Sequence, residues 1–247
     1  MSNLTTDLNM ANRQCCDLDI RDYKTKEPWM FADFCNTTTA NISADAVYAN
    51  KKGAKCIKFD NPLEGTITME FQVSPFRIYA MLSDGEIETS AIIARREDIA
   101  GEAEGVINLT KTPVSGSVFV VDSSTGKTIA GNVEAKKFTA TTTSEIVVGT
   151  TYEVSYLEEK NSGVKRVSFN NKKVPKDFFI QMVTNNRDEN GDEVAMRLTA
   201  YKASPQRNFE LSFASDGDPS SVTLTCDLMT DRDGNVLDMV EILEDEK

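Results

Sequence analysis

The chain of 247 residues contains no histidine. This absence excludes catalytic triads with a histidine base, histidine general bases and metal sites built on imidazole ligands. The chain also has a single tryptophan and only six tyrosines, which are scattered along the sequence. A surface-binding or carbohydrate-binding β-module would be expected to gather such aromatics into an exposed cluster, and the sequence shows no such cluster.

Long apolar runs are missing as well, and none approaches the roughly 20 residues that a helix needs to cross a bilayer. The first 22 residues are polar and acidic and lack the hydrophobic core of a secretory signal. Proline is scarce, at seven residues, while 40% of the residues are hydrophobic. This balance predicts a folded chain that neither enters a membrane nor stays disordered.

The cysteines form no CxxC pair and are odd in number. A chain without a signal sequence is expected to be made in a cytoplasm, where thiols stay reduced. We therefore interpret all of them as reduced thiols. They are Cys15, Cys16, Cys35, Cys56 and Cys226.

Negative charge dominates the chain, since 39 acidic residues oppose 27 basic ones and give a formal charge of −12. A protein that reads nucleic-acid sequence needs a basic footprint, so this class is disfavoured. The simplest role of the charge is solubility. The other role left open is a surface along which phosphate groups slide without being held.

No motif in the chain predicts a catalytic, cofactor or metal site. Residues 124–128, Ser-Thr-Gly-Lys-Thr, lack the upstream glycine of a phosphate-binding loop and lie between short β-runs, which indicates a hairpin turn. Residues 231–235, Asp-Arg-Asp-Gly-Asn, lack the spacing and the twelfth-position glutamate of a calcium loop and indicate a β-turn. The many carboxylates fall mainly on polar faces and turns, so an enzyme is not expected.

The last quarter of the chain shows the clearest pattern. Residues 209–214 and 222–228 both alternate apolar and polar side chains around a Ser-Asp-Gly-Asp-Pro turn, which predicts an antiparallel pair with one buried and one wet face. Glu210 and Asp227 lie on the predicted wet face. The predicted core residues are Phe209, Leu211, Phe213, Val222, Leu224 and Cys226.

A second amphipathic hairpin is predicted nearer the N-terminus. It joins a strand at residues 55–60 to one at residues 67–73, where Ile67, Met69 and Phe71 alternate with polar residues that include Glu70. Residues 74–85 follow with an N-cap serine, a proline at the first helical position and a closing glycine. This pattern predicts a short helix with Phe76, Tyr79, Ala80 and Leu82 on one face.

Short β-runs at near-regular spacing fill residues 102–160, after a glycine-rich entry at residues 99–105. Such spacing is typical of a small immunoglobulin-like module inserted into a host domain. The alternative is that these strands belong to one large sandwich.

Two parts of the chain resemble bacteriophage tail tube proteins. The first runs from Val47-Tyr-Ala-Asn-Lys-Lys-Gly through Gly65-Thr-Ile-Thr-Met-Glu to Ser83-Asp-Gly. The second includes Ala200-Tyr-Lys-Ala-Ser-Pro-Gln-Arg-Asn-Phe-Glu-Leu and Asp216-Gly-Asp-Pro-Ser-Ser-Val-Thr-Leu-Thr-Cys-Asp-Leu. The resemblance covers about half of the chain, and the middle segment and the acidic N-terminal arm depart from it.

The resemblance implies an all-β fold, a β-sandwich or half-barrel with one short flanking helix, together with a small inserted immunoglobulin-like β-sandwich. We expect a first part at residues 1–101 with a polar arm at 1–26, the insert at 102–160, and a second part at 161–247. Such proteins form stacked hexameric rings whose sheets join into one inner barrel, and inserted modules decorate the outside.

The function implied by the resemblance is structural, in a virion tail, with genomic DNA passing through the lumen without specific binding. Implied partners are further copies of the chain, a tape measure protein, a terminator, a baseplate and, in a contractile tail, a sheath. Glu70, Glu210 and Asp227 are the candidate wet-face residues for a lumen or an inter-subunit surface. The alternatives are another phage structural β-protein, such as a capsid decoration or tail completion protein, or a surface-binding module.

Overall fold

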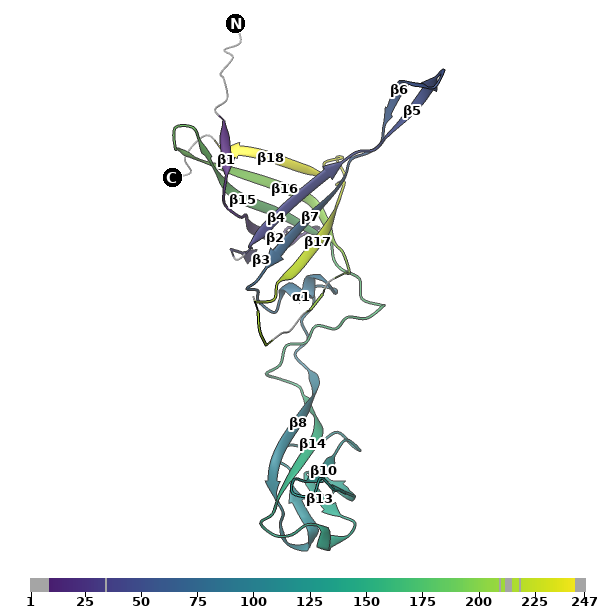
Figure 1. The fold of residues 1–247 in the computed structure, drawn as a ribbon, viewed down its shortest axis with the longest axis vertical. Helices are drawn as coiled ribbons and strands as arrows, with labels where there is room; N and C mark the ends of the chain where they lie inside the picture. The colour runs from purple at the N-terminus through teal and green to yellow at the C-terminus, as the bar shows by residue number, and fades with distance from the viewer. Residues whose placement is uncertain (1–8, 34, 209, 212–214, 218, 243–247) are drawn as a thin grey trace. The chain divides into compact units, whose positions relative to one another are not determined.

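A computed structural model of the protein describes residues 9–33, 35–208, 210–211, 215–217 and 219–242 (Figure 1). Almost all regular structure in these residues is β, with one α-helix and two 3-10 turns, so the all-β prediction is confirmed. The described helical segments are too short and too polar to span a bilayer. The chain divides into unit 1, residues 1–86 and 168–247, and unit 2, residues 87–167.

Unit 1 is built on one antiparallel sheet with the strand order β3-β2-β15-β16-β17-β7-β4, to which β1 adds beside β15 and β18 beside β16. The strands are β1 (Met10–Asn12), β2 (Asp17–Asp22), β3 (Pro28–Ala32), β4 (Thr37–Ser43), β7 (Glu64–Phe71), β15 (Phe178–Asp188), β16 (Glu193–Pro205), β17 (Val222–Met229) and β18 (Leu237–Ile242).

Strand β16 is shared by two leaves of this sheet. Residues 195–200 of β16 pair with β18, whereas residues 202–205 pair with β17. The inward side chains of both leaves meet in one core. From the β2 and β15 leaf come Leu18, Ile20, Phe178 and Ile180, and from the β7 and β17 leaf come Ile67, Met69, Phe71, Leu224 and Cys226, all at most 1% exposed.

The predicted strand at residues 209–214 is wrong where the structure describes it. Strand β16 ends at Pro205, and Glu210 and Leu211 lie outside any strand, with Leu211 44% exposed. Proline has no backbone N–H to donate, which favours the end of pairing there. Phe209 and Phe213 lie outside the described residues. The partner strand is as predicted, since Val222, Leu224 and Cys226 of β17 are buried.

The predicted pairing of residues 55–60 with residues 67–73 is also wrong. Strand β6 (Ala54–Asp60) pairs with β5 (Ala46–Lys51), and β7 pairs instead with β4 and β17. Lys52 and Gly53 form the two-residue turn between β5 and β6, both with positive φ, at 52° and 86°. Positive φ at both central residues gives a tight turn that matches the twist of the strands. This turn pairs β6 with β5, the strand directly before it, rather than with β7.

The one α-helix of the described residues, α1, covers Ile78–Met81 and is shorter than predicted. Its N-cap is Arg77 rather than Ser74, and no side chain caps it. The buried positions are Ile78, Ala80 and Met81 in the helix and Leu82 directly after it. Ala80 and Leu82 are therefore buried as predicted, whereas Phe76 is 42% exposed instead of packing inward. The predicted closing glycine, Gly85, has φ +79° and donates its N–H to the carbonyl of Ala80 at 2.8 Å.

Unit 2 has a core of its own, formed between a four-stranded sheet β11-β10-β14-β8 and a three-stranded sheet β12-β13-β9. Its largest buried side chains include Ile107, Tyr152 and Tyr156. The elements are β8 (Ala91–Ala100), η1 (Ala103–Gly105), β9 (Val106–Asn108), β10 (Phe119–Asp122), β11 (Thr128–Ile129), β12 (Gly131–Glu134), β13 (Lys137–Ala140), η2 (Thr143–Glu145) and β14 (Thr151–Lys160). Strand β8 precedes the range 102–160 expected for the insert.

Excision of residues 87–167 and their replacement by a short Gly/Ser linker is expected to leave unit 1 folded. Unit 2 has its own core, and an antiparallel bridge between Glu88 and Arg166 brings its entering and leaving segments together, so a short linker suffices. A variant that lacks only residues 102–160 should instead unfold or aggregate. It loses β14, which leaves β8 without its ten residue pairings to that strand.

Circular dichroism and thermal melting of the two variants provide the comparison. Loss of the cooperative transition in the 87–167 variant would show that unit 1 depends on unit 2 for its stability.

Candidate functional site

On one face, the three strands β4, β7 and β17 carry only uncharged and acidic side chains, and a lysine, Lys202, follows on the adjoining strand β16 opposite Met229. The register places Glu70 opposite both Thr37 and Thr223, and Thr66 opposite both Asn41 and Asp227. The three strands contain no lysine or arginine at any position. We name this surface the threonine–carboxylate face. Its members are Thr37, Thr39, Asn41, Ser43, Glu64, Thr66, Thr68, Glu70, Thr223, Thr225, Asp227 and, at the end, Met229.

The opposite face of β7 and β17 is buried, whereas on the edge strand β4 the residue Ile42 of that face remains 40% exposed. Side chains of a strand alternate between its two faces, so Cys226 points inward next to the outward Asp227. Burial, and secondarily the negative charge of Asp227, raises the pKa of Cys226 to about 12. The strands therefore separate a solvated acidic surface from an apolar core within the thickness of one sheet.

Hydrogen bonds along the face join neighbouring strands. The hydroxyls of Thr68 and Thr225 are 3.3 Å apart across β7 and β17, and Gln206 donates to Asp227 at 2.7 Å. Glu70 and Asp227 lie four register positions apart, about 13 Å at the rise of a strand. That separation exceeds the roughly 5–9.5 Å between the paired carboxylates of a glycosidase.

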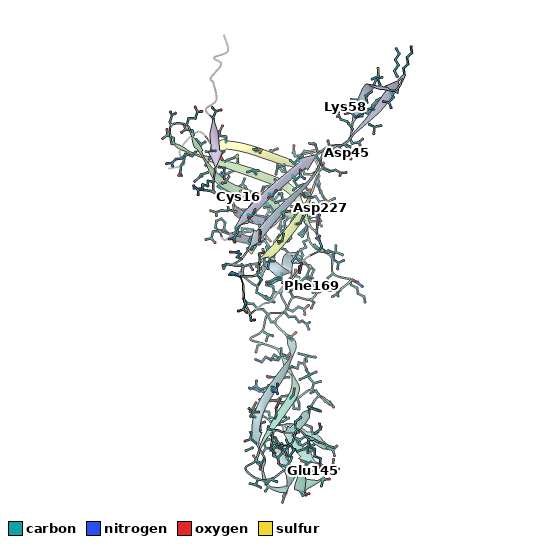
Figure 2. The ribbon with its side chains drawn as sticks, in the orientation of Figure 1. Cys16, Asp45, Lys58, Glu145, Phe169 and Asp227 are labelled. Carbon is teal, nitrogen blue, oxygen red and sulfur yellow. The ribbon has the colours of Figure 1, made fainter. Side chains whose placement is uncertain are left out.

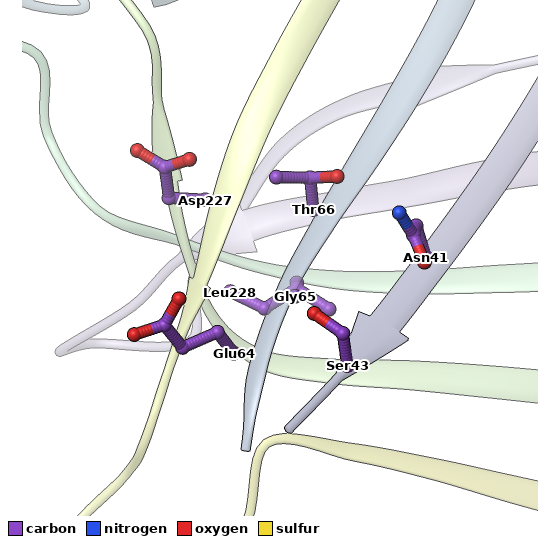
Figure 3. Close-up of a pocket in the computed structure, with 7 residues that line it drawn as sticks. All are labelled: Asn41, Ser43, Glu64, Gly65, Thr66, Asp227 and Leu228. Atoms are coloured by element: carbon purple, nitrogen blue, oxygen red, sulfur yellow. The ribbon is translucent and has the colours of Figure 1, made fainter. Parts of the chain in front are cut away.

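A pocket open to solvent lies at one end of the face (Figure 3). Gly65 allows the close packing of this corner, since a Cβ there would stand 3.0 Å from the backbone oxygen of Asn41 and from a Leu228 methyl. The carboxylates of Glu64 and Asp227 are the charged groups of its lining. The lining residues are Asn41, Ser43, Glu64, Gly65, Thr66, Asp227 and Leu228.

In the described part of the chain, no three or more Cys, Asp or Glu side chains gather in a way that could hold a metal ion. The groups that this face offers to a neighbour are thus hydroxyls, amides and carboxylates. All of these groups bind water well, and the carboxylates repel phosphate.

The structure brings together two of the three residues predicted from the sequence. Glu70 on β7 and Asp227 on β17 share the face, and Asp227 is labelled on unit 1 in Figure 2. Glu210 is exposed and lies in the loop before β17, outside the strands of the face. Sequence reasoning missed Glu64 and the whole of β4, although the β-branched run Thr37-Thr38-Thr39 is typical of a strand.

The fold and this face define a β-sandwich protein with a polar, acidic sheet surface. Residues 13–242 match the sequence profile of the YomU/Tube protein family. The chain belongs to the YomU/Tube protein family. No curated protein matches the chain. Membership of this family makes it a phage tube protein, a structural component of the virion tail that assembles into oligomers with other tail proteins.

Proposed function

We propose that the protein is a tail tube subunit that assembles into stacked hexameric rings, with the threonine–carboxylate face lining a lumen through which genomic DNA passes during ejection. The observation that carries this proposal is the absence of lysine and arginine from β4, β7 and β17. The DNA is not bound specifically but slides along the wall.

The physical reason is the cost of holding a polyanion in transit. Fixed cations would retain phosphates by ion pairing and by release of counterions. Carboxylates repel the duplex over about one Debye length, roughly 8 Å at physiological salt, and leave a layer of water between wall and DNA. The hydroxyls of the threonines hydrogen-bond that water without adding charge.

Open strand edges support assembly into a ring. Among the described strands, β3 pairs only with β2, and β4 pairs only with β7, so both present an unpaired edge. Exposed edges promote aggregation unless they are covered. Pairing between neighbouring copies would cover these edges and join the sheets into one continuous barrel.

The β5–β6 hairpin provides a second assembly surface. Within the part of the chain that the structure describes, its two strands pair only with each other, and in Figure 1 they stand clear of the other strands of unit 1. Val47 pairs with Phe59 and Ala49 with Ile57, so these four share a face, which we name the hairpin apolar face. Val47, Ile57 and Phe59 are 55–59% exposed.

A second copy of the chain is the occupant that fits this hairpin. An isolated two-stranded hairpin is marginally stable in water, so a partner is needed to cover its apolar side. Residues 46–60 contain four lysines and one aspartate, whereas the chain as a whole carries −12. The basic hairpin is therefore complementary in charge to the acidic body of another subunit.

Unit 2 fits the role of an inserted immunoglobulin-like module on the outside of the tube. Support comes from its two packed antiparallel sheets and its separate core. The other partners that we propose are a tape measure protein, a terminator, a baseplate and, in a contractile tail, a sheath.

Phage carrying Glu70→Lys together with Asp227→Lys should assemble tails yet eject DNA more slowly at low salt. The two lysines would hold passing phosphates, and the delay should shrink as salt screens the contact. Glu134→Lys with Glu159→Lys is the matched control, because both glutamates are exposed in unit 2 and the charge change is equal. An ejection rate equal to that of the control at every salt concentration would contradict the lumen assignment.

A further inference from the structure

Three cysteines gather around one threonine of unit 1. Cys15 and Cys16 lie between β1 and β2, and Cys35 lies just before β4. The sulfurs of Cys15 and Cys35 are 3.5 Å and 3.2 Å from the same atom, Oγ1 of Thr38. Cys16 is the chain neighbour of Cys15, and all three thiols are partly buried. Figure 2 marks Cys16 within unit 1.

Thr38 stands opposite Met69, which is buried, so its side chain is on the inner side of the edge strand β4. The thiols therefore lie where the segment before β2 meets the edge of the other leaf. Because the sulfurs of Cys15 and Cys35 both contact Oγ1 of Thr38, they lie no more than about 7 Å apart. The other two cysteines are elsewhere, Cys56 exposed on the hairpin and Cys226 buried in the core.

We propose that Cys15 and Cys35 are an oxidation site and form an intrachain disulfide once the protein has left the reducing cytoplasm in which it is made. The setting of this proposal rests on the proposed function, because a virion component is released from its host cell. Disulfides persist outside cells and are kept reduced within a cytosol. The bond would tie the segment between β1 and β2, which carries Cys15, to the segment that enters β4, which carries Cys35. It would close a loop of about 20 residues.

The oxidant is a small-molecule disulfide such as oxidised glutathione. The thiolate of Cys15 attacks one of its sulfurs and releases one small-molecule thiolate. Cys35 then loses its proton to solvent, and its sulfur attacks the sulfur of Cys15 and displaces the second small-molecule thiolate. Two protein thiols are oxidised to one disulfide, and one small-molecule disulfide is reduced to two thiols.

Burial delays this reaction at neutral pH. It raises the pKa of Cys35 to about 11, with smaller opposing contributions from hydrogen bonds, so its thiolate is scarce near pH 7. Burial also raises the pKa of Cys16. The rate of oxidation is therefore expected to increase with pH, and the thiols stay reduced during synthesis.

Treatment of the full-length protein with oxidised glutathione at about pH 8.5 tests the site. Thiol titration in denaturant should fall from five reactive groups to three, and mass spectrometry of a nonreduced digest should show the peptides of Cys15 and Cys35 joined. The melting temperature should rise by about 6–12 °C and return to its starting value with a reductant.

Serine variants assign the pair. Cys15→Ser and Cys35→Ser should each abolish the rise in melting temperature, whereas Cys16→Ser and Cys56→Ser should keep it. If Cys35→Ser does not fold, Cys15→Ser and the digest still decide the question. A bond between Cys16 and Cys35, a bond between Cys15 and Cys16, crosslinks through Cys56 alone or five unreacted thiols would each overturn the proposal.

The oxidation is measured on the isolated subunit, so its result can be distinguished from the result of the test for tube assembly. Oxidised subunits that never form tubes would count against the tube proposal alone. Tubes that form but lack the bond after oxidation would count against the disulfide alone.

Discussion

Ile57→Asp is expected to abolish tube assembly while the subunit stays folded. Ile57 lies on the hairpin apolar face and is 55% exposed in the single subunit, so a carboxylate there meets water and costs the fold little. In the proposed assembly the same carboxylate would be buried against another copy without a partner charge, at a cost of several kcal/mol. The concentration needed for assembly should rise at least about 100-fold.

Electron microscopy and sedimentation at increasing protein concentration measure this effect. The matched control is Ile92→Asp in unit 2, which has the same chemical change at a similar exposure of 57%. That variant should assemble as the parent does. Equal assembly by both variants would mean that the hairpin apolar face does not contact a second copy.

Phe71→Ala is expected to lower the free energy of unfolding of unit 1 by about 3–5 kcal/mol. Phe71 is fully buried at the end of β7, opposite Val222 of β17, so the truncation leaves a cavity between the two leaves of the sheet. Domains of ordinary stability have about 5–15 kcal/mol in total. The melting temperature should therefore fall by roughly 10 °C or more.

Glu70→Ala is the matched control, because Glu70 directly precedes Phe71 in the same strand and points to the other face. Thermal melting of the two variants and the parent gives the comparison, and Glu70→Ala should stay within about 1 °C of the parent. Equal losses from both variants would show that the strand does not separate a core from a wet face.

The elements that the sequence predicts best are those with long alternation. Strands β7 and β17 each alternate over eight residues, and their apolar positions Ile67, Met69, Leu224 and Cys226 all lie in the core. Period-2 alternation directly reports which side of a strand is buried, so burial follows from local sequence.

Strand partners could not be predicted in the same way. β7 pairs with β17, about 155 residues further along the chain, whereas the sequence favours the nearer segment at residues 55–60. That nearer segment turns back at Lys52 and Gly53, and a Lys-Gly turn is a weaker signal than Asn-Gly or Asp-Gly. The short alternation at residues 209–214 likewise resembles a strand, although Glu210 and Leu211 are exposed loop residues.

The candidate site was predictable only in part for the same reason. The outward direction of Glu70 and Asp227 follows from alternation, but their common face depends on the β7–β17 register, which is nonlocal. Strand β4 has little apolar alternation because Thr37, Thr39 and Asn41 face solvent while the inward position between the two threonines is again a threonine. The threonine-rich part of the face therefore has no hydrophobic signal. The predicted strand position of Glu210 is wrong, because Glu210 and Leu211 lie in an exposed loop.

A density map of the assembled tube is the most direct test of the acidic conduit. The proposal predicts hexameric rings in which Glu64, Glu70 and Asp227 face the channel, with the hairpin apolar face covered by a neighbouring copy. A lumen lined mainly by lysine and arginine, or rings with the threonine–carboxylate face on their outer surface, would contradict it.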